Sequence, residues 1–292
     1  MAYLQMVSDG YVWCDHFENV SRRRHGKTRR PDFVFERTDG SIAVVEAKGT
    51  HSGARNRLNH YLHQTYHAQV SPHLGVELTC GIVTRGYAIG AWCTSKKKAE
   101  FIIHHTAVQE PEGDAPKVDE RPTGSVELRR GNYLAAAGLL FGGEFAKALS
   151  TRTWDVDTAT FAVAEWIGRK WLLGLRPPTR PQWLGGWVYP DDRDEGPAWR
   201  EFSGYALDLE VASRVLRAFD GQGSQDALGQ IRPVPASVIE KARENDGAVF
   251  PDGLALIGNI YDISPIRELA WNPDASEFFD PNLLPSQRHL ST

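Results

Sequence analysis

Short apolar runs separated by turn residues dominate the first third of the chain. The runs at residues 33–35 and 42–45 flank Asp39-Gly40, a pattern that predicts two antiparallel strands joined by a tight turn. Residues 53–70 carry apolar positions at helical spacing, with polar side chains on the opposite side. Further strands, with Arg85-Gly86 as a turn, are predicted at residues 79–84, 87–93 and 100–106. This order of elements predicts a mixed α/β fold, a sheet with helices on its faces.

The predicted hairpin carries three charged groups beside its apolar strands, namely Asp32, Glu46 and Lys48. Charged side chains are rarely tolerated beside buried strands unless they are paired or bind an ion. Glu46 and Lys48 are two residues apart on one strand, so their side chains project to the same face. We therefore expect a partner or an ion on that face.

The length of the turn decides whether Asp32 reaches the same face. A two-residue loop at Asp39-Gly40 would place Asp32 opposite Ala47, on the wrong face. A three-residue loop, residues 38–40 with Gly40 left-handed in a bulge, places Asp32 opposite Glu46. Side chains in that register lie close enough for both carboxylates to hold one hard cation. We predict the three-residue loop.

The order Pro31-Asp32, a spacer of thirteen residues, and Glu46-Ala47-Lys48 resembles the motif of the PD-(D/E)XK phosphodiesterases, the restriction-endonuclease-like superfamily. The resemblance implies a nuclease core in which Asp32 and Glu46 bind Mg²⁺, or Mn²⁺ in its place, while Lys48 supports the attacking water. Physical chemistry assigns the same roles, because Mg²⁺ takes one or two carboxylates plus phosphate oxygens and a nearby lysine stabilises developing charge. The alternative is a surface hairpin that carries an ordinary Glu–Lys pair.

The resemblance also implies further site residues. A first helix, expected within residues 1–20, often contributes an acidic metal ligand in this family, for which Glu18 or, second, Asp15 is the candidate. The helix after the catalytic strand often presents a polar residue, for which Gln64 is the candidate. Three histidines share the polar side of that helix and are interpreted as phosphate contacts, zinc ligands or a solvated surface: His60, His63 and His67.

Basic residues gather immediately before the motif. Residues 21–30 read SRRRHGKTRR, with six Lys or Arg in ten positions, and Lys96, Lys97 and Lys98 form a second run. Clustered cations beside a metal site suit a polyanionic backbone, although a solvated loop is an equally common explanation of a basic run. The predicted nucleic-acid contacts are Arg22, Arg23, Arg24, Lys27, Arg29, Arg30 and His60.

Composition places the chain among ordinary globular proteins. Its 292 residues are 41% hydrophobic and 24% charged, with a formal net charge of -4. No apolar run is long enough to span a bilayer and no secretory signal opens the chain, so the expected location is the cytoplasm, without membrane contact. The odd number of cysteines, Cys14, Cys80 and Cys93, argues against a disulfide scaffold.

The second half of the chain differs in pattern. Residues 109–124 are rich in proline and charge and predict a linker or long loop after a nuclease-like core at residues 1–108. Residues 125–292 predict a mainly helical region for substrate selection or partner docking, including helices at residues 131–149, 158–173, 205–219, 236–245 and 265–271.

The predicted function is therefore Mg²⁺-dependent hydrolysis of phosphodiester bonds, with DNA as the expected substrate. The resemblance suggests a restriction, antiviral genome-defence or mobile-element system. Because an uncontrolled nuclease would damage its host, we expect control by a regulatory or motor subunit, by assembly into a homo-oligomer or by modification of the substrate. The alternative is a catalytically silent nuclease-fold module that binds nucleic acid or a protein. The sequence does not separate DNA from RNA as substrate.

Overall fold

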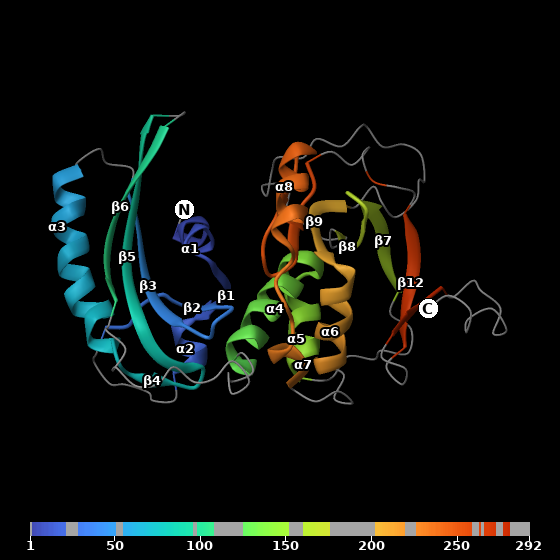
Figure 1. The fold of residues 1–292 in the computed structure, drawn as a ribbon, viewed down its shortest axis with the longest axis horizontal. Helices are drawn as coiled ribbons and strands as arrows, with labels where there is room; N and C mark the ends of the chain where they lie inside the picture. The colour runs from blue at the N-terminus through green and yellow to red at the C-terminus, as the bar shows by residue number, and fades with distance from the viewer. Residues whose placement is uncertain are drawn as a thin grey trace. The chain divides into compact units, whose positions relative to one another are not determined.

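The protein consists of two compact units, each built around its own sheet (Figure 1). The computed structural model describes residues 2–21, 29–50, 55–95, 98–107, 125–151, 160–175, 202–219, 226–258, 263, 266–272 and 277–280. Unit 1 comprises Met1–Asn132 and Leu228–Gln230, and unit 2 comprises Tyr133–Ala227 and Ile231–Thr292. The division falls inside helix α4 (Val126–Phe141), whereas the predicted linker at residues 109–124 lies outside the described residues.

Unit 1 is a mixed α/β unit with a six-stranded sheet. Its described helices are α1 (Ala2–Ser8), α2 (Phe17–Val20), α3 (Arg55–Thr65), the π-helix η1 (Tyr66–Val70) and the 3₁₀-helix η2 (Ser71–His73). Its strands are β1 (Tyr11–His16), β2 (Phe33–Arg37), β3 (Ile42–Thr50), β4 (Glu77–Leu78), β5 (Gly81–Ser95) and β6 (Lys98–Ala107). The strand order is β1-β2-β3-β5-β4, with β6 also paired to β5, and only β3 and β5 run parallel. The prediction of a mixed sheet with helices is confirmed.

The β2–β3 hairpin has the predicted register. Phe33 pairs with Val45 and Phe35 with Ala43, which is the alignment that a three-residue loop produces. The Arg37 N–H donates to the Ser41 carbonyl over 3.0 Å. Gly40 has φ +82°, a left-handed conformation that glycine adopts without a steric penalty. The predicted loop of residues 38–40 is confirmed.

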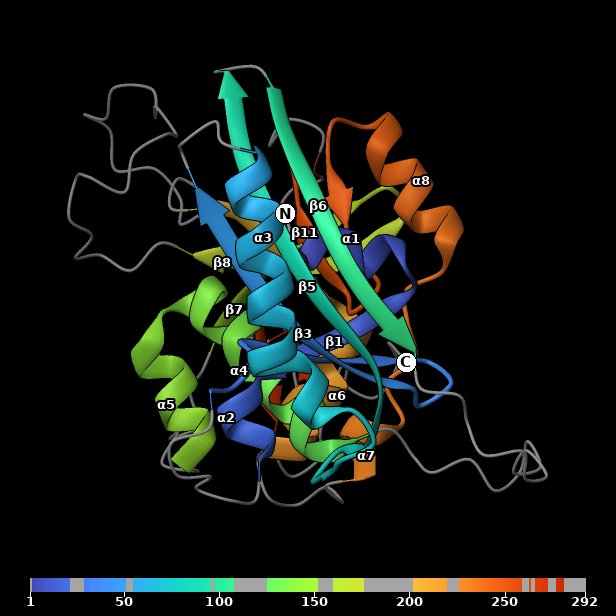
Figure 2. The same ribbon diagram turned by 90° about the vertical axis from the view of Figure 1, so that its left-hand side faces the viewer.

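Helices cover both faces of this sheet. Figures 1 and 2 show α1 on one face and α3 on the other. On the α1 face, Met6 packs with Phe35, Val45 and other buried residues. On the α3 face, a Cβ at Gly86 would lie 2.5 Å from Val70 Cγ1, so only glycine lets the helical segment approach β5 this closely. The predicted turn at Arg85-Gly86 is therefore wrong: Gly86 is a packing contact inside the continuous strand β5.

The predicted first helix is also wrong in part. Tyr11–His16 forms β1, and helices occupy only Ala2–Ser8 and Phe17–Val20. β1 has buried side chains on both faces, namely those of Tyr11, Val12, Trp13 and Asp15. A strand covered on both sides loses the alternation by which strands are recognised, so its sequence resembles a helix.

Unit 2 contains a seven-stranded antiparallel sheet, so the prediction of a mainly helical region is wrong. Its strands are β7 (Thr160–Trp166), β8 (Arg169–Leu175), β9 (Phe202–Asp208), β10 (Ala248–Val249), β11 (Leu254–Leu256), β12 (Arg267–Asn272) and β13 (Glu277–Phe279). The helices after α4 are α5 (Gly143–Thr151), α6 (Leu209–Phe219), α7 (Asp226–Gly229) and α8 (Ala236–Glu244). The strand order is β10-β11-β9-β8-β7-β12-β13.

The hairpin β7–β8 explains the largest error. The predicted helix at residues 158–173 is two strands joined at Ile167 and Gly168, whose φ values are +51° and +80°. Two successive left-handed residues form the tight turn that suits the twist of a hairpin. Trp166 and Trp171 are core residues on the two strands.

No helix among the described residues has the length and apolar character needed to cross a membrane.

Candidate functional site

Three charged side chains predicted from the motif lie just before β2 and in the second half of β3. The register of the hairpin continues from Phe33 and Val45 to place Asp32 opposite Glu46. Glu46 and Lys48 lie beside Ala88 and Gly90 of β5, on the face that α3 and η1 cover. The fold therefore brings Asp32, Glu46 and Lys48 together on one face of the sheet.

Asp32 marks the point at which the hairpin ladder ends. Its carboxylate Oδ2 accepts a hydrogen bond from the Ala47 N–H over 2.9 Å, in place of a main-chain partner. Pro31, the residue before it, has no N–H to continue the ladder. Asp32 is also fixed through its main chain, because its N–H donates to the Val45 carbonyl and its carbonyl accepts from the Phe17 N–H. These bonds hold the half-buried carboxylate at the strand end, with Oδ2 engaged.

Glu46 is the most deeply buried of the three. Its side chain is 0% exposed, and Oε1 accepts a hydrogen bond from the Lys48 ammonium. Oε2 is buried without a hydrogen-bond partner among the described residues. Burial raises the pKa of Glu46, the Lys48 hydrogen bond opposes that shift, and the Asp32 charge adds to it. An unsatisfied oxygen of a buried carboxylate is costly unless a ligand completes it.

Lys48 is a cation in this arrangement. Burial acts to lower its pKa, but the hydrogen bond to Glu46 and the charges of Glu46 and Asp32 outweigh burial and raise the pKa. Its side chain is 25% exposed, so the ammonium is accessible at the edge of the site. Lys48 can therefore donate hydrogen bonds or stabilise negative charge, but it is not a base at neutral pH.

Gln69 joins the site and was not predicted. The Gln69 amide is close enough to Glu46 to favour the charged carboxylate, and its Nε2 donates to the Arg30 carbonyl over 2.7 Å. Gln64, the predicted residue, is exposed, and its Nε2 lies 2.9 Å from Nε2 of His60. The helix changes from α to π geometry at Tyr66, which alters the direction of every later side chain. A helical wheel with a constant period could not have found Gln69.

Glu18 and Asp15, the acidic residues predicted as further metal ligands, have other partners in the structure. The Glu18 carboxylate is 77% exposed and pairs with Arg30 over 3.5 Å. Asp15 is buried in β1, where Oδ1 accepts hydrogen bonds from the His16 N–H and the Asn19 amide. In the part of the chain that the structure describes, no group of three His, Cys, Asp or Glu residues is arranged to hold a metal, so Glu18 does not complete a set with Asp32 and Glu46.

The structure describes only some of the predicted nucleic-acid contacts. Arg29 is exposed, Arg30 is half-buried and paired with Glu18, and His60 is exposed on α3. The remaining residues of the basic run lie outside the described residues: Arg22, Arg23, Arg24 and Lys27. The run at residues 96–98 is likewise without described side chains.

Two carboxylates are nevertheless a suitable donor set for one kind of ion. Mg²⁺ demands octahedral oxygen coordination but gives up its waters reluctantly, so it is commonly held by one or two carboxylates and completed by water or phosphate. Asp32 and Glu46 fit that requirement, and the unsatisfied Glu46 Oε2 is an oxygen donor that the protein itself leaves free among the described residues.

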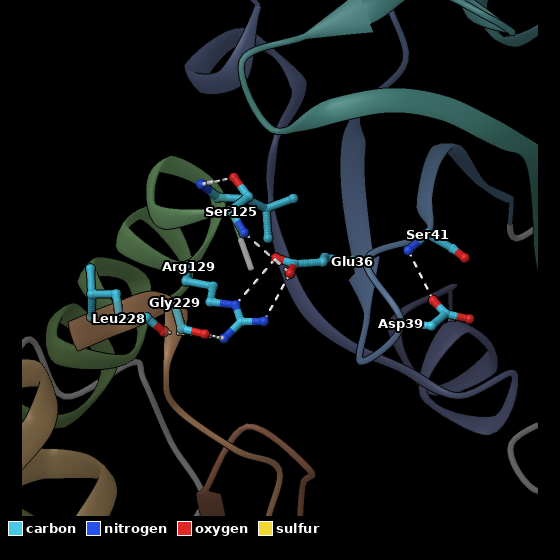
Figure 3. A network of polar contacts seen from close by, with 8 residues as sticks. Glu36, Asp39, Ser41, Ser125, Arg129, Leu228 and Gly229 are labelled. Carbon is cyan, nitrogen blue, oxygen red and sulfur yellow. Dashed lines mark hydrogen bonds and ion pairs between the residues drawn. The ribbon is translucent and has the colours of Figure 1, made fainter. Parts of the chain in front are cut away.

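A second buried glutamate on the same face has a different environment (Figure 3). Both oxygens of Glu36 are hydrogen-bonded: Oε1 accepts from Arg129 Nη2 over 2.8 Å and from the Ser125 N–H, and Oε2 accepts from Arg129 Nε. Arg129 Nη1 donates to the carbonyls of Leu228 and Gly229. The guanidinium also stacks on Trp13, 3.4 Å from the ring centroid. This glutamate is saturated with partners and has no oxygen left for a ligand.

Comparisons with known proteins were made at the level of families, sequences and folds. No family model, no curated protein and no solved structure gives a significant match to this chain.

Proposed function

We propose that unit 1 is a Mg²⁺-dependent nuclease of the restriction-endonuclease-like type, which hydrolyses phosphodiester bonds in DNA. The observation that carries the proposal is the pairing of a buried, half-satisfied Glu46 with Asp32 on the adjacent strand and Lys48 two residues further on. A purely structural Glu–Lys pair would not need Asp32 beside it, because a second carboxylate raises the cost of keeping Glu46 charged.

The residues divide the chemical work between them. Asp32 and Glu46 would hold Mg²⁺, with Mn²⁺ able to substitute. When bound, Mg²⁺ supplies a Lewis acid that activates water and neutralises charge on the phosphate. Lys48 donates hydrogen bonds to the attacking water or to the phosphate oxygens, because its ammonium remains protonated beside the two carboxylates. Gln69 positions Glu46 and, through the Arg30 carbonyl, the start of β2.

The substrate class rests on charge. Arg29 is an exposed cation close in sequence to Asp32, and the run at residues 22–28 adds further positive charge there. Positive side chains beside a phosphodiester-cleaving site bind the nucleic-acid backbone without regard to sequence. Selection of a target, within a defence or mobile-element system, is then assigned to unit 2, to a regulatory or motor subunit, or to assembly into a homo-oligomer.

Cleavage assays with the full chain test the proposal. Supercoiled, linear and single-stranded DNA, and RNA, are incubated with Mg²⁺, with Mn²⁺ or with chelator. We expect metal-dependent cleavage of DNA that falls at least about 10²-fold in Asp32→Ala and Lys48→Ala, since the loss of one electrostatic stabiliser costs this much in comparable sites. Gln64→Ala is the matched control, because the Gln64 side chain is exposed and lies against His60 of the same helix.

The results of the cleavage assays distinguish the proposed site, the substrate and the alternative function. Cleavage that persists in both Asp32→Ala and Lys48→Ala would refute the assigned site. Metal-dependent cleavage of RNA alone would correct the substrate. Binding of DNA without cleavage under every condition would identify the catalytically silent module, which is the alternative function.

A further inference from the structure

Histidine side chains gather on the side of α3 that faces away from β3. His63 lies near the end of α3, His67 in η1 and His104 on β6. The rings of His63 and His67 are 4.5 Å apart between centroids, and those of His63 and His104 are 5.8 Å apart. His63 and His67 are exposed, and neither contributes to the apolar core of unit 1. His67 follows His63 by four residues, so the helical repeat places the two exposed rings side by side.

The separation of the two ring nitrogens is informative. Nε2 of His63 and Nε2 of His67 lie 3.3 Å apart. Two nitrogens that share a tetrahedral Zn²⁺ with Zn–N bonds of about 2.0–2.1 Å are separated by about 3.3–3.4 Å. Without an ion, the same distance is a long hydrogen bond between the two imidazole rings. The pair is thus already spaced as two ligands of one ion.

A third imidazole ring, that of His104, lies beside the pair and is fixed by a hydrogen bond. Its Nε2 lies 3.0 Å from Oδ1 of Asn59, and a carbonyl oxygen can only accept, so Nε2 carries the hydrogen. In the form of His104 that carries one ring proton, the nitrogen with the free lone pair is therefore Nδ1. A hydrogen bond from one ring nitrogen to a carbonyl oxygen is the usual way in which proteins orient a metal-binding histidine.

We infer that His63 and His67 form a two-histidine binding site for a divalent transition metal ion such as Zn²⁺. His104 lies beside this pair, and the described residues supply no third ligand in a coordinating arrangement. Imidazole nitrogens suit zinc, copper and nickel, whereas Mg²⁺ requires oxygen donors. The site is separate from the carboxylates: His104 pairs with Ala88, and Ala88 lies beside Glu46, so His104 and Glu46 are about 9–10 Å apart across two strand spacings. α3 packs over β5 between them.

The position of the pair gives the ion a structural consequence. His63 belongs to the α-helical part of the segment and His67 to the π-helical part, so an ion held by both would fix the junction at Tyr66. Gln69 follows His67 by two residues in η1 and approaches Glu46 on the opposite side of the segment. Transition-metal binding would therefore stabilise the turn that carries Gln69. The binding itself does not depend on nuclease activity.

Calorimetric titration of the full chain, without a purification tag, tests the inference directly. Zn²⁺ is titrated into wild type, His63→Ala, His67→Ala and His60→Ala. We expect one site in wild type whose affinity falls at least about tenfold when either His63 or His67 is removed, because loss of a ligand exceeds the 10–100-fold cost of losing an outer partner. His60→Ala is the matched control, an exposed histidine of the same helix whose ring contacts Gln64, and it should bind as wild type does.

Thermal unfolding provides a second readout. Zn²⁺ should raise the melting temperature of wild type and His60→Ala but not of His63→Ala or His67→Ala, since only a ligand bound to the folded state stabilises it. Unchanged affinity in both His63→Ala and His67→Ala, or an equal loss in His60→Ala, would overturn the inference. Glu46→Gln should retain Zn²⁺ affinity, and its loss there would show that the ion binds at the carboxylates instead. The Cys80 thiol is a poor competitor, because burial raises its pKa to about 12.

Discussion

Two glutamates on adjacent strands of unit 1, Glu36 and Glu46, are buried to the same degree and face the same side of the sheet, yet they differ in their partners. Glu36 is 1% exposed and Glu46 0%. Arg129 and the Ser125 N–H engage both oxygens of Glu36, whereas Oε2 of Glu46 has no hydrogen-bond partner among the described residues. Burial raises the pKa of both carboxyls. Partner saturation, and not burial, thus separates the glutamate that holds the fold from the one that is free to bind a ligand.

Arg129→Met should cause the largest change in stability. The substitution leaves Glu36 buried without its cation and also frees the Leu228 and Gly229 carbonyls. Breaking a buried pair by removing one partner costs about 3–5 kcal/mol. Urea denaturation should therefore show a much lower free energy of unfolding.

A double variant and an exposed-pair control test whether the loss of stability in Arg129→Met arises from the buried Glu36–Arg129 pair. Glu36→Gln combined with Arg129→Met removes both charges and should recover part of the loss. Arg214→Ala breaks the exposed Arg214–Glu210 pair of α6 and should cost less than about 0.5 kcal/mol. A loss in Arg129→Met no greater than in Arg214→Ala would contradict the structural role of Glu36.

Glu46→Gln should lower cleavage activity without lowering stability, in contrast to Arg129→Met. The amide keeps the shape of the side chain but removes the charge, so metal-dependent cleavage should fall at least about 10²-fold. Stability should stay the same or rise, because a buried carboxylate beside Asp32 is no longer charged. Parallel measurements of cleavage rate and melting temperature in Glu46→Gln check the expected loss of activity and the expected unchanged or higher stability. A variant that unfolds as Arg129→Met does would show that Glu46 is structural.

Gln69→Ala and Gln64→Ala together test whether the helical segment that covers the sheet supports Glu46 through Gln69. Gln69 favours the charged form of Glu46 and bonds to the Arg30 carbonyl, whereas Gln64 is exposed. We expect a loss of cleavage of about tenfold in Gln69→Ala, the lower end of the effect of removing an outer partner of a metal ligand, and none in Gln64→Ala. The metal concentration for half-maximal cleavage should rise in Gln69→Ala. Equal activity in the two variants would remove Gln69 from the site.

Local signals explain what the sequence could predict. The register of Asp32 and Glu46 depends on the turn at Gly40 and on the two-residue period of the strands, both readable within a short stretch. The role of Glu36 was not predicted because Arg129 is 93 residues away in the chain. Gln69 was missed because the period of the helix changes at η1. The strands of unit 2 were mistaken for helices where Ile167 forms a left-handed turn that its residue type does not favour.

Asp15 is a third buried carboxylate of unit 1, intermediate between the two glutamates, and offers the smallest test. Its Oδ1 accepts hydrogen bonds from the His16 N–H and the Asn19 amide, and burial raises its pKa. An unfolded aspartate ionises near pH 3.9, below the folded group, so the unfolded state loses its proton first. The stability that this group contributes is therefore fully present below that pH and declines as pH rises through the higher folded pKa.

Asp15→Asn should remove this decline and stabilise the protein at pH 7 by about 1 kcal/mol, the lower range for one desolvated polar group. We expect no gain in stability below pH 3.9. Urea denaturation of both proteins at the two pH values measures the difference, and an Asp15→Asn variant that is less stable at pH 7 would show that the carboxylate is as fully compensated as Glu36.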